Sequence, residues 1–319
     1  MTFAGTLDRV ESQLVPDAGF ELDTFAISGF PRTLSPTLFR AGWQAVRAPF
    51  SCLAILRRRR PDVVLGGGGY VAGPMVLAAR ILGIPAALTE ADAHLGLANR
   101  LAVPFAKRVF LAYDVPGRSG KRYRVVGRPI PVAHQGATRE EGRRLFGLPA
   151  DGPVVAVFGA LAGATTLNEM AVDAWAESGP SVLHISGERD YAALAERVSR
   201  PGYVLVPQTH TFGAALAAAD LAVSRAGGTV WELAAAGTPS ILVPYPYATA
   251  DHQTLNAQYF EQGGGALVVP NDEAARIPAL VDELLADTGR LAAMREGMLE
   301  LARPDAAQVI AEELLALAR

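Results

Sequence analysis

The chain has 319 residues, of which 50% are hydrophobic, 19% charged and 7% aromatic, and its formal net charge is -3. So high an apolar fraction with so small a net charge excludes a disordered chain, and the length fits two domains. The pI near 6.0 gives no sign of a nucleic-acid binder, and the single cysteine, Cys52, excludes an internal disulfide and a cysteine-based zinc site.

Short apolar runs rich in β-branched residues recur along the chain, with helical patterns between most of them. This alternation predicts an α/β architecture of doubly wound parallel sheets. The predicted strands are residues 62–65, 85–88, 108–111, 125–126, 154–158, 181–185, 203–206, 221–223 and 240–243.

Two blocks of this pattern meet at Val126–Pro131, where two prolines make a stiff extended joint. Met1–Thr6 reads as a second strand, so we expect the first βα unit of this fold to be missing from this sequence. The expected parts are a first domain over 1–128, a second over 129–303 and a terminal helix over 304–319.

The longest uncharged stretches, 63–79, 152–168 and 233–250, are each interrupted by glycine or proline, which argues against a transmembrane helix. Met1–Thr6 lacks the basic and apolar regions of a signal peptide. We therefore expect a cytoplasmic protein.

Two glycine-rich turns follow predicted strands. In Gly66–Pro74, backbone amides and the start of a helix, which carries about half a positive charge, suit an anion, although a tight strand-to-helix turn is the alternative. Gly159–Ala164 repeats the pattern with apolar side chains, which favours a close helix-strand packing turn over an anion site.

Ser224–Pro239 begins where another predicted strand ends. An anion at the start of the following helix would meet free amides, and Glu232, one turn in, can accept hydrogen bonds from the vicinal hydroxyls of a ribose. Alternatively, Glu232 complements the helix dipole, and the segment taken alone favours that interpretation.

Polar side chains also follow the next predicted strand, from Pro244 to Ala257. Carboxamides there can bind sugar hydroxyls because each offers donors and an acceptor in one plane. Asp251 is alternatively a cap for a helix that starts near His252, and both functions can coexist. The five histidines show no metal-binding spacing, and His184, inside a predicted buried strand, is expected to be a core residue with satisfied hydrogen bonds.

Ser224–Pro239 together with Asp251–Ala257 strongly resembles the MurG family, bacterial transferases that use UDP-N-acetylglucosamine to complete lipid II for peptidoglycan. The C-terminal motif is specific, because other enzymes of the GT-B fold rarely carry it. The likeness covers nearly the whole chain. Further matching segments are Val15–Phe20, Ser28–Gly29, Pro61–Pro74, Gly96–Arg100, Val126–Pro129 and Arg303–Ala307.

The resemblance implies a GT-B fold, in which two Rossmann-like domains face a cleft, with the UDP-sugar on the C-terminal domain and the lipid acceptor on the N-terminal one. It implies an inverting, metal-independent transfer without a cofactor. A hydroxyl of lipid I attacks the anomeric carbon of N-acetylglucosamine while helix-end amides stabilise the departing diphosphate. It also implies a peripheral protein on the cytoplasmic face of the cell membrane.

The resemblance assigns residues to each substrate. The diphosphate falls to Gly227, Gly228 and Thr229, the ribose to Glu232, and the sugar to Gln253 and Asn256, with Gly163 and Thr209 also in the substrate site. The acceptor pyrophosphate falls to Gly67, Gly68, Gly69 and Tyr70. The family histidine that is the candidate general base would lie before residue 1, which leaves Glu90 and Asp92 as substitutes.

The chain departs from the family pattern at three places. Thr89–Asp92 replaces a His-Glu-Gln-Asn string, Leu161 replaces a serine that contacts the donor, and Pro131 stands where the family usually has arginine. These departures keep open a related transferase with another nucleotide sugar or acceptor. The expected loss of the first βα unit keeps open a GT-B protein that binds without turnover.

An apolar stretch followed by arginines suggests contact with the inner membrane surface. Leu38, Phe39, Trp43, Val46 and Phe50 precede Arg57–Arg60. The alternative is a helix packed on the sheet with a solvated arginine run. Pro49 is expected to interrupt any single helix here.

Overall fold

The computed structural model describes residues 1–28, 36–159 and 164–319, with side chains left out of the description for 36–41. By their internal contacts these residues divide into unit 1, residues 1–126 with 308–319, and unit 2, residues 127–307. No helix among the described residues is both long and apolar enough to cross a bilayer.

Unit 1 holds two parallel sheets, one of two strands in the order β1-β2 and one of four in the order β3-β4-β5-β6. Its elements are β1 (Phe3–Gly5), α1 (Glu11–Asp17), β2 (Leu22–Thr24), α2 (Pro36–Arg59), β3 (Val64–Gly66), α3 (Gly69–Ile81), β4 (Ala86–Glu90), α4 (Leu97–Ala102), η1 (Val103–Phe105), β5 (Arg108–Leu111), β6 (Tyr123–Val125) and α13 (Ala306–Ala318).

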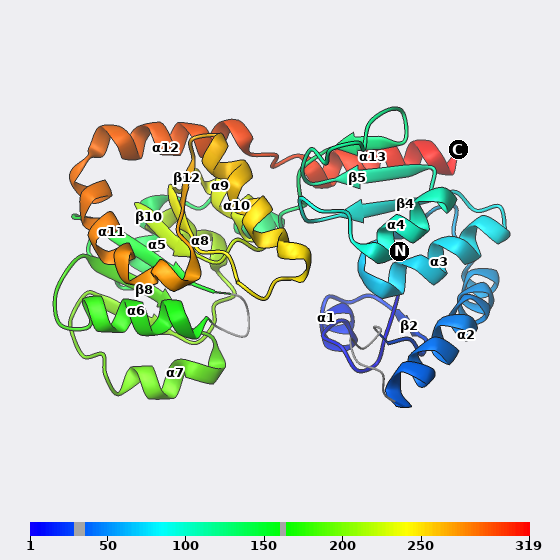
Figure 1. Cartoon of the computed structure of the whole chain (residues 1–319), viewed down its shortest axis with the longest axis horizontal. Coiled ribbons are helices and arrows are strands. Elements are labelled where there is room, and N and C mark those ends of the chain that lie inside the picture. The colour runs from blue at the N-terminus through cyan, green and yellow to red at the C-terminus, as the bar shows by residue number, and fades with distance from the viewer. Residues whose placement is uncertain (29–35, 160–163) are drawn as a thin grey trace. The chain divides into compact units, whose positions relative to one another are not determined.

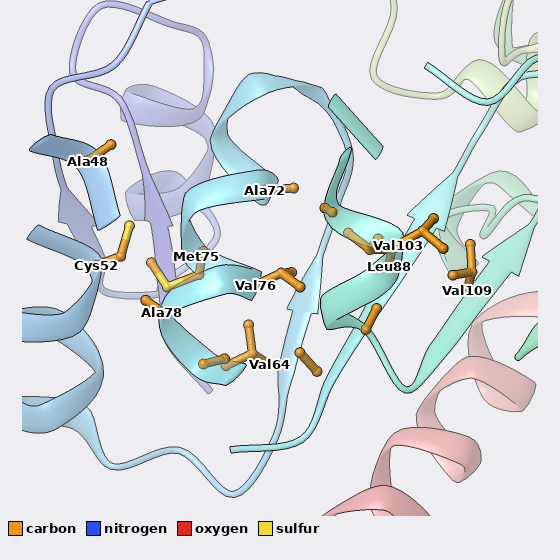
Figure 2. Packing of buried hydrophobic residues seen from close by; sticks show 14 of the residues in the cluster. Ala48, Cys52, Val64, Ala72, Met75, Val76, Ala78, Leu88, Val103 and Val109 are labelled. Atoms are coloured by element: carbon orange, nitrogen blue, oxygen red, sulfur yellow. The ribbon is translucent and has the colours of Figure 1, made fainter. Parts of the chain in front are cut away.

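The core of unit 1 is a layer of apolar side chains around α3. Figure 2 shows α3 between α2, which contributes Cys52, and the strands, which contribute Val64 and Leu88. Cys52 is fully buried, and burial raises the pKa of its thiol to about 12. The thiol therefore stays protonated and acts as a small apolar group in the core.

The predicted terminal helix is confirmed as α13, and it packs on the four-stranded sheet of unit 1 (Figure 1). Because side chains alternate along a strand, Leu88 faces α3 while its neighbour Ala87 faces α13. Ile310 is buried there, and Glu313 forms ion pairs with Arg108 and Arg124. The last residues of the chain thus complete the core of the unit that holds the first residues.

The predicted break at Pro49 is wrong, because α2 is one helix from Pro36 to Arg59. Proline removes one backbone donor, but the helix continues because its inner face, with Ala48 and Cys52, is buried in the core on both sides of Pro49. The arginine run is also partly neutralised, since Arg58 and Arg59 form ion pairs with Asp23 at 2.7 and 2.8 Å.

Unit 2 holds one parallel sheet of six strands in the order β12-β11-β10-β7-β8-β9. Its elements are η2 (Val132–His134), α5 (Arg139–Leu145), β7 (Val154–Phe158), α6 (Thr165–Trp175), β8 (Ser181–Ile185), α7 (Glu188–Ala195), β9 (Tyr203–Val206), α8 (Phe212–Ala218), β10 (Leu221–Ser224), α9 (Val230–Ala236), β11 (Ser240–Leu242), η3 (Thr249–Asp251), α10 (His252–Gln262), β12 (Ala266–Val268), η4 (Asn271–Arg276), α11 (Ile277–Ala286) and α12 (Thr288–Leu301).

Both faces of the six-stranded sheet are covered by helices. Val157 and Val223 lie side by side in the register and pack with residues of α6 and α11, such as Leu167 and Ile277. Side chains of the opposite face, such as Leu183, pack against α8. The strand order reverses between β7 and β10, and ligands of open α/β sheets bind at the carboxyl ends of strands at such a point.

All nine predicted strands are present, and the parallel pairing throughout confirms the predicted α/β architecture. The start of the chain is a strand, as predicted, and two more strands were missed. The missed β2 has three residues, one of them Asp23, so it shows no apolar run. The missed β12 is a short apolar run that directly follows the three glycines Gly263–Gly265. A glycine break followed by an apolar run does predict a strand, so this one could have been found.

Candidate active site

The turn 225–229 lies between β10 and α9, on the strand next to the reversal of strand order. The first residue of the turn, Arg225, is fixed in place by its own side chain. Nη1 of this buried guanidinium donates to the carbonyl oxygens of Val243 at 3.1 Å and Pro244 at 3.2 Å. The guanidinium also lies 5.7 Å from the ring centroid of Tyr245. Burial lowers the pKa of Arg225, and the contacts with carbonyls and the aromatic ring favour its cation.

The three residues assigned to the diphosphate, Gly227, Gly228 and Thr229, follow in the same turn and are partly exposed. A Cβ atom added to Gly227 would lie 4.0 Å from Nε2 of Gln253, so this glycine and this amide are neighbours. Thr229 precedes the first residue of α9, and its side chain makes no capping bond. The turn therefore presents backbone and a hydroxyl beside the Gln253 amide.

Glu232, assigned to the ribose, is held by a residue that sequence analysis did not single out. Its Oε1 lies 2.5 Å from Nδ1 of His134, and both side chains are mostly buried. The His134 ring in turn contacts the ring of Phe212 edge-on, with centroids 5.8 Å apart. His134 thus orients the Glu232 carboxylate from outside α9. Interaction with the helix dipole alone does not account for this contact.

The two carboxamides of α10 have different surroundings. Gln253 accepts a hydrogen bond from the backbone N–H of Tyr245 at 2.9 Å through Oε1, which turns its Nε2 towards Gly227. Asn256 is fully buried, and its Nδ2 donates to the carbonyl oxygen of Ala226 at 3.2 Å. Gln253 is therefore placed beside the turn, whereas Asn256 supports the turn from within the core.

The structure confirms a helix from His252 but not the predicted cap. Asp251 has a left-handed backbone, with φ of 52°, and its side chain accepts no capping hydrogen bond from a backbone N–H of the helix. Its Oδ1 instead accepts a hydrogen bond from the hydroxyl of Thr254 at 2.7 Å. The capping prediction is wrong because this backbone conformation differs from the extended one that capping residues normally adopt.

The remaining residues assigned to the substrates of unit 2 lie apart from this turn in the sequence. Thr209 follows β9, and its Oγ1 accepts a hydrogen bond from the N–H of Thr211 at 3.1 Å, just before α8. Gly163 and Leu161 lie outside the described residues.

In unit 1, the glycines assigned to the acceptor follow β3. Gly66 is packed, because an added Cβ would lie 2.8 Å from Cδ2 of Leu88, whereas one on Gly67 or Gly69 would meet nothing within 4 Å. Gly68 and Gly69 have φ of 93° and 67°, which glycine adopts without strain. Tyr70 packs against the apolar core. This turn therefore presents bare backbone, with the partly buried Tyr70 packed against the core beside it.

Glu90, offered as a substitute base, holds a loop. Its Oε1 accepts from the N–H of Ala91 at 3.0 Å, and its Oε2 accepts from the N–H of Gly96 at 2.9 Å and from Nδ2 of Asn99 at 2.9 Å. The other substitute, Asp92, lies in this loop, and its N–H donates to Glu90 at 3.4 Å. The Glu90 carboxylate thus holds the segment 91–99 together through these hydrogen bonds.

His184 is a core residue with satisfied hydrogen bonds, as predicted. It is fully buried, with Nδ1 2.8 Å from the hydroxyl of Tyr203 and Nε2 3.0 Å from Oδ1 of Asn168. Burial lowers its pKa to about 4. Throughout the described parts of the chain, no group of three His, Cys, Asp or Glu side chains is arranged to hold a metal ion.

Two family models match the chain. The glycosyltransferase family 28 N-terminal domain matches residues 2–111, and the C-terminal domain of the same family matches residues 154–310. Two curated relatives are both called UDP-N-acetylglucosamine--N-acetylmuramyl-(pentapeptide) pyrophosphoryl-undecaprenol N-acetylglucosamine transferase. That of Rubrobacter xylanophilus is 38% identical over 100% of this chain and 96% of its own length. The relative from Mycobacterium sp. (strain KMS) is 39% identical over 100% of this chain and 88% of its own length.

The chain belongs to the MurG family. The crystal structure of MurG from Acinetobacter baumannii matches 99% of this chain and 90% of its own chain, with a TM-score of 0.78 and 27% identity. The predicted GT-B fold class, with two parallel-sheet domains, is thereby confirmed.

Three site residues of this MurG-family chain escaped sequence analysis. Arg128, whose guanidinium lies against Gly228, belongs to the joint Val126–Pro131, where Val126–Pro129 was given as a matching segment but with no site role, and His134 follows that joint by three residues. Asn99, whose Nδ2 lies beside Gly68 and donates to the carbonyl oxygen of Thr89, belongs to the matching segment Gly96–Arg100. No local pattern predicts that His134 meets Glu232, because the two are 98 residues apart.

Proposed function

We propose that this chain transfers N-acetylglucosamine from UDP-N-acetylglucosamine to lipid I, forming lipid II and releasing UDP. The observation that carries the proposal is the turn 225–229 with Glu232 and Gln253 beside it, at the carboxyl end of β10. Membership of the MurG family supports the same donor and acceptor, because the relatives are named for this reaction.

The donor lies along the turn of unit 2 in this proposal. Backbone amides of Gly227 and Gly228 and the hydroxyl of Thr229 bind the diphosphate. Glu232 binds the ribose hydroxyls, and its hydrogen bond with His134 keeps the carboxylate in place. Gln253 reaches the sugar through Nε2, while Asn256 and Thr209 act by holding the backbone around them.

The acceptor lies on unit 1, where the open glycines 67–69 offer backbone N–H groups to its pyrophosphate. The reaction is inverting and metal-independent in this proposal. The lipid I hydroxyl attacks C1 of the sugar, and the C1–O bond to the diphosphate breaks with its electron pair on UDP. The contacts of Glu90 with the 91–99 segment support a structural role for this carboxylate.

A transfer assay tests the proposal. The whole chain is incubated with labelled UDP-N-acetylglucosamine and a short-chain lipid I analogue, and labelled lipid and free UDP are both measured. We expect them in equal amounts, with undiminished rate in EDTA. UDP binding without product contradicts turnover, and a faster reaction with another UDP-sugar contradicts the donor.

We further propose that the protein is peripheral on the cytoplasmic face of the cell membrane. Trp43, Val46 and Phe50 share one face of α2 and are 63%, 64% and 69% exposed, and Arg47 lies 5.8 Å from the centroid of the Trp43 ring. Apolar side chains with neighbouring cations are typical of helices that lie in the membrane interface. The side chains of Leu38 and Phe39 lie outside the described set.

Vesicle sedimentation tests this membrane contact. We expect Trp43→Ser to weaken binding to phosphatidylglycerol vesicles severalfold, because the indole is a large part of the exposed apolar face. The matched control is Leu145→Ser, which removes an exposed apolar side chain from α5 of unit 2. Equal losses for both variants, or equal binding to neutral phosphatidylcholine vesicles, would contradict the proposal.

A further inference from the structure

Arg128 lies over the glycine turn of unit 2. It directly follows the first residue of the unit, and a Cβ atom added to Gly228 would lie 1.7 Å from its Nη1 and 2.1 Å from its Cζ. Only a glycine at position 228 leaves this space for the guanidinium. The sequence thus brings a permanent cation onto one of the residues assigned to the diphosphate, from a position 100 residues earlier.

Within the described residues, the half-buried Arg128 side chain has no hydrogen bond or ion pair. The other buried arginines of unit 2 differ. Arg143 forms an ion pair with Asp220 at 2.7 Å and donates to three backbone carbonyls through Nη1, and Arg225 donates to two carbonyls. A cation that is partly removed from water without an anion favours binding of one.

The charged and polar side chains around the turn indicate what kind of anion fits. The Arg128 guanidinium lies at Gly228, the Gln253 amide lies at Gly227, and the Glu232 carboxylate lies one helical turn further on. A ligand with phosphates at one end and two neighbouring hydroxyls at the other matches this order. The Glu232 carboxylate repels phosphate but accepts hydrogen bonds from hydroxyls. A nucleoside diphosphate has this chemistry.

We propose that Arg128 binds the diphosphate of the nucleotide and stabilises it as it leaves, an inference that rests on the proposed function. When the C1–O bond breaks, its electron pair stays on the diphosphate oxygen, so UDP gains one negative charge. The new sugar bond forms to the acceptor oxygen, whose proton goes to a base other than Arg128. Arg128 moves no proton, because its guanidinium remains protonated, and acts by its charge and its N–H donors.

The test compares ligands with and without phosphate. Calorimetry of the whole chain measures UDP, and ligand-observed NMR measures uridine. We expect Arg128→Gln to weaken UDP about tenfold or more, as for loss of a charge-assisted hydrogen bond, and to leave uridine within about twofold. Arg128→Lys, which keeps the charge without the planar fork, should fall between. Arg144→Gln, which removes an exposed arginine from α5, is the matched control.

Kinetics and stability separate this role from a structural one. Stabilisation of the leaving group predicts that Arg128→Gln lowers kcat as well as raising KM for the donor, each by roughly tenfold, with an unchanged Tm. Equal weakening of UDP and uridine, or a matching loss in Arg144→Gln, would overturn the proposal. Failure of the unsubstituted chain to bind UDP contradicts the proposed function as well, whereas UDP binding that Arg128→Gln leaves unchanged contradicts this inference alone.

Discussion

The two units bury different kinds of side chain. Among the described residues, three polar or charged side chains are buried in unit 1 and nine in unit 2. Those of unit 1 are Thr6, Asp23 and Asn99. Those of unit 2 are Arg143, Asn168, His184, Ser186, Ser224, Arg225, Thr238, Ser240 and Asn256.

This difference shows two ways of holding a glycine turn at a strand end. In unit 1, Gly66 packs against Leu88, and the turn is supported mainly by an apolar layer. In unit 2, Arg225, Asn256 and Gln253 tie the turn and the following loop together by hydrogen bonds with fixed directions. Apolar packing fixes shape, whereas buried hydrogen bonds also fix the position of individual polar atoms. The turn of unit 2 is therefore the one in which individual polar atoms have fixed positions.

The largest expected consequence of the comparison is that acid destabilises unit 2 before unit 1. His184 is neutral in the folded state down to a pKa of about 4, whereas in the unfolded chain it takes up a proton near its ordinary 6.5. The unfolded state therefore binds more protons between these values, and unit 2 loses about 3 kcal/mol as pH falls from 6.5 to 4.

The carboxyl of Asp23 in unit 1 behaves differently. Hydrogen bonds from Arg59 hold its pKa below the ordinary 3.8, so its contribution is present above that value and is lost only at lower pH. Hydrogen exchange of β8 and β4 amides at pH 7, 5.5 and 4 measures each unit separately. His184→Gln should flatten the pH dependence of β8 alone. An equal response of β4 would refute the comparison.

A second, smaller effect compares the two buried asparagines that lie beside the turns, Asn256 and Asn99. Asn256→Ala leaves the Ala226 carbonyl without its donor, which we expect to cost about 2 kcal/mol. Asn99→Ala also removes donors, to Thr89 and Glu90, but it should cost only about 1 kcal/mol. Glu90 keeps its bonds from Ala91 and Gly96, and the change removes the buried Oδ1 of Asn99, which has no hydrogen-bond partner in the described structure. Urea unfolding, followed for each unit by hydrogen exchange, gives both values, and a larger cost for Asn99→Ala would reverse the contrast.

The sequence predicts regular elements well because each is determined by neighbouring residues. The run Val154–Phe158 is apolar and becomes a fully buried strand. Contacts between residues far apart in the sequence are not predicted in this way. The motif does point to Asn256, but its burial against Ala226 depends on how α10 lies on the turn, 30 residues away. The contact of Arg128 with Gly228 likewise depends on the path of the chain after β6, which no periodicity determines.

The smallest effect tests the difference between the two turns with one methyl group. Gly228→Ala should weaken UDP binding by about tenfold, because its Cβ takes the space of the Arg128 guanidinium. Gly67→Ala should leave UDP affinity unchanged, since nothing lies within 4 Å of its added Cβ and it belongs to unit 1.

The stability of Gly228→Ala should change by about 1 kcal/mol or less, because Gly228 has no positive φ and the end of a long arginine side chain can swing away. Combining Gly228→Ala with Arg128→Gln should then weaken UDP little more than either change alone, since both remove one contact. Calorimetry of the four proteins gives the coupling. Fully additive losses would mean that Gly228 acts on the nucleotide independently of Arg128.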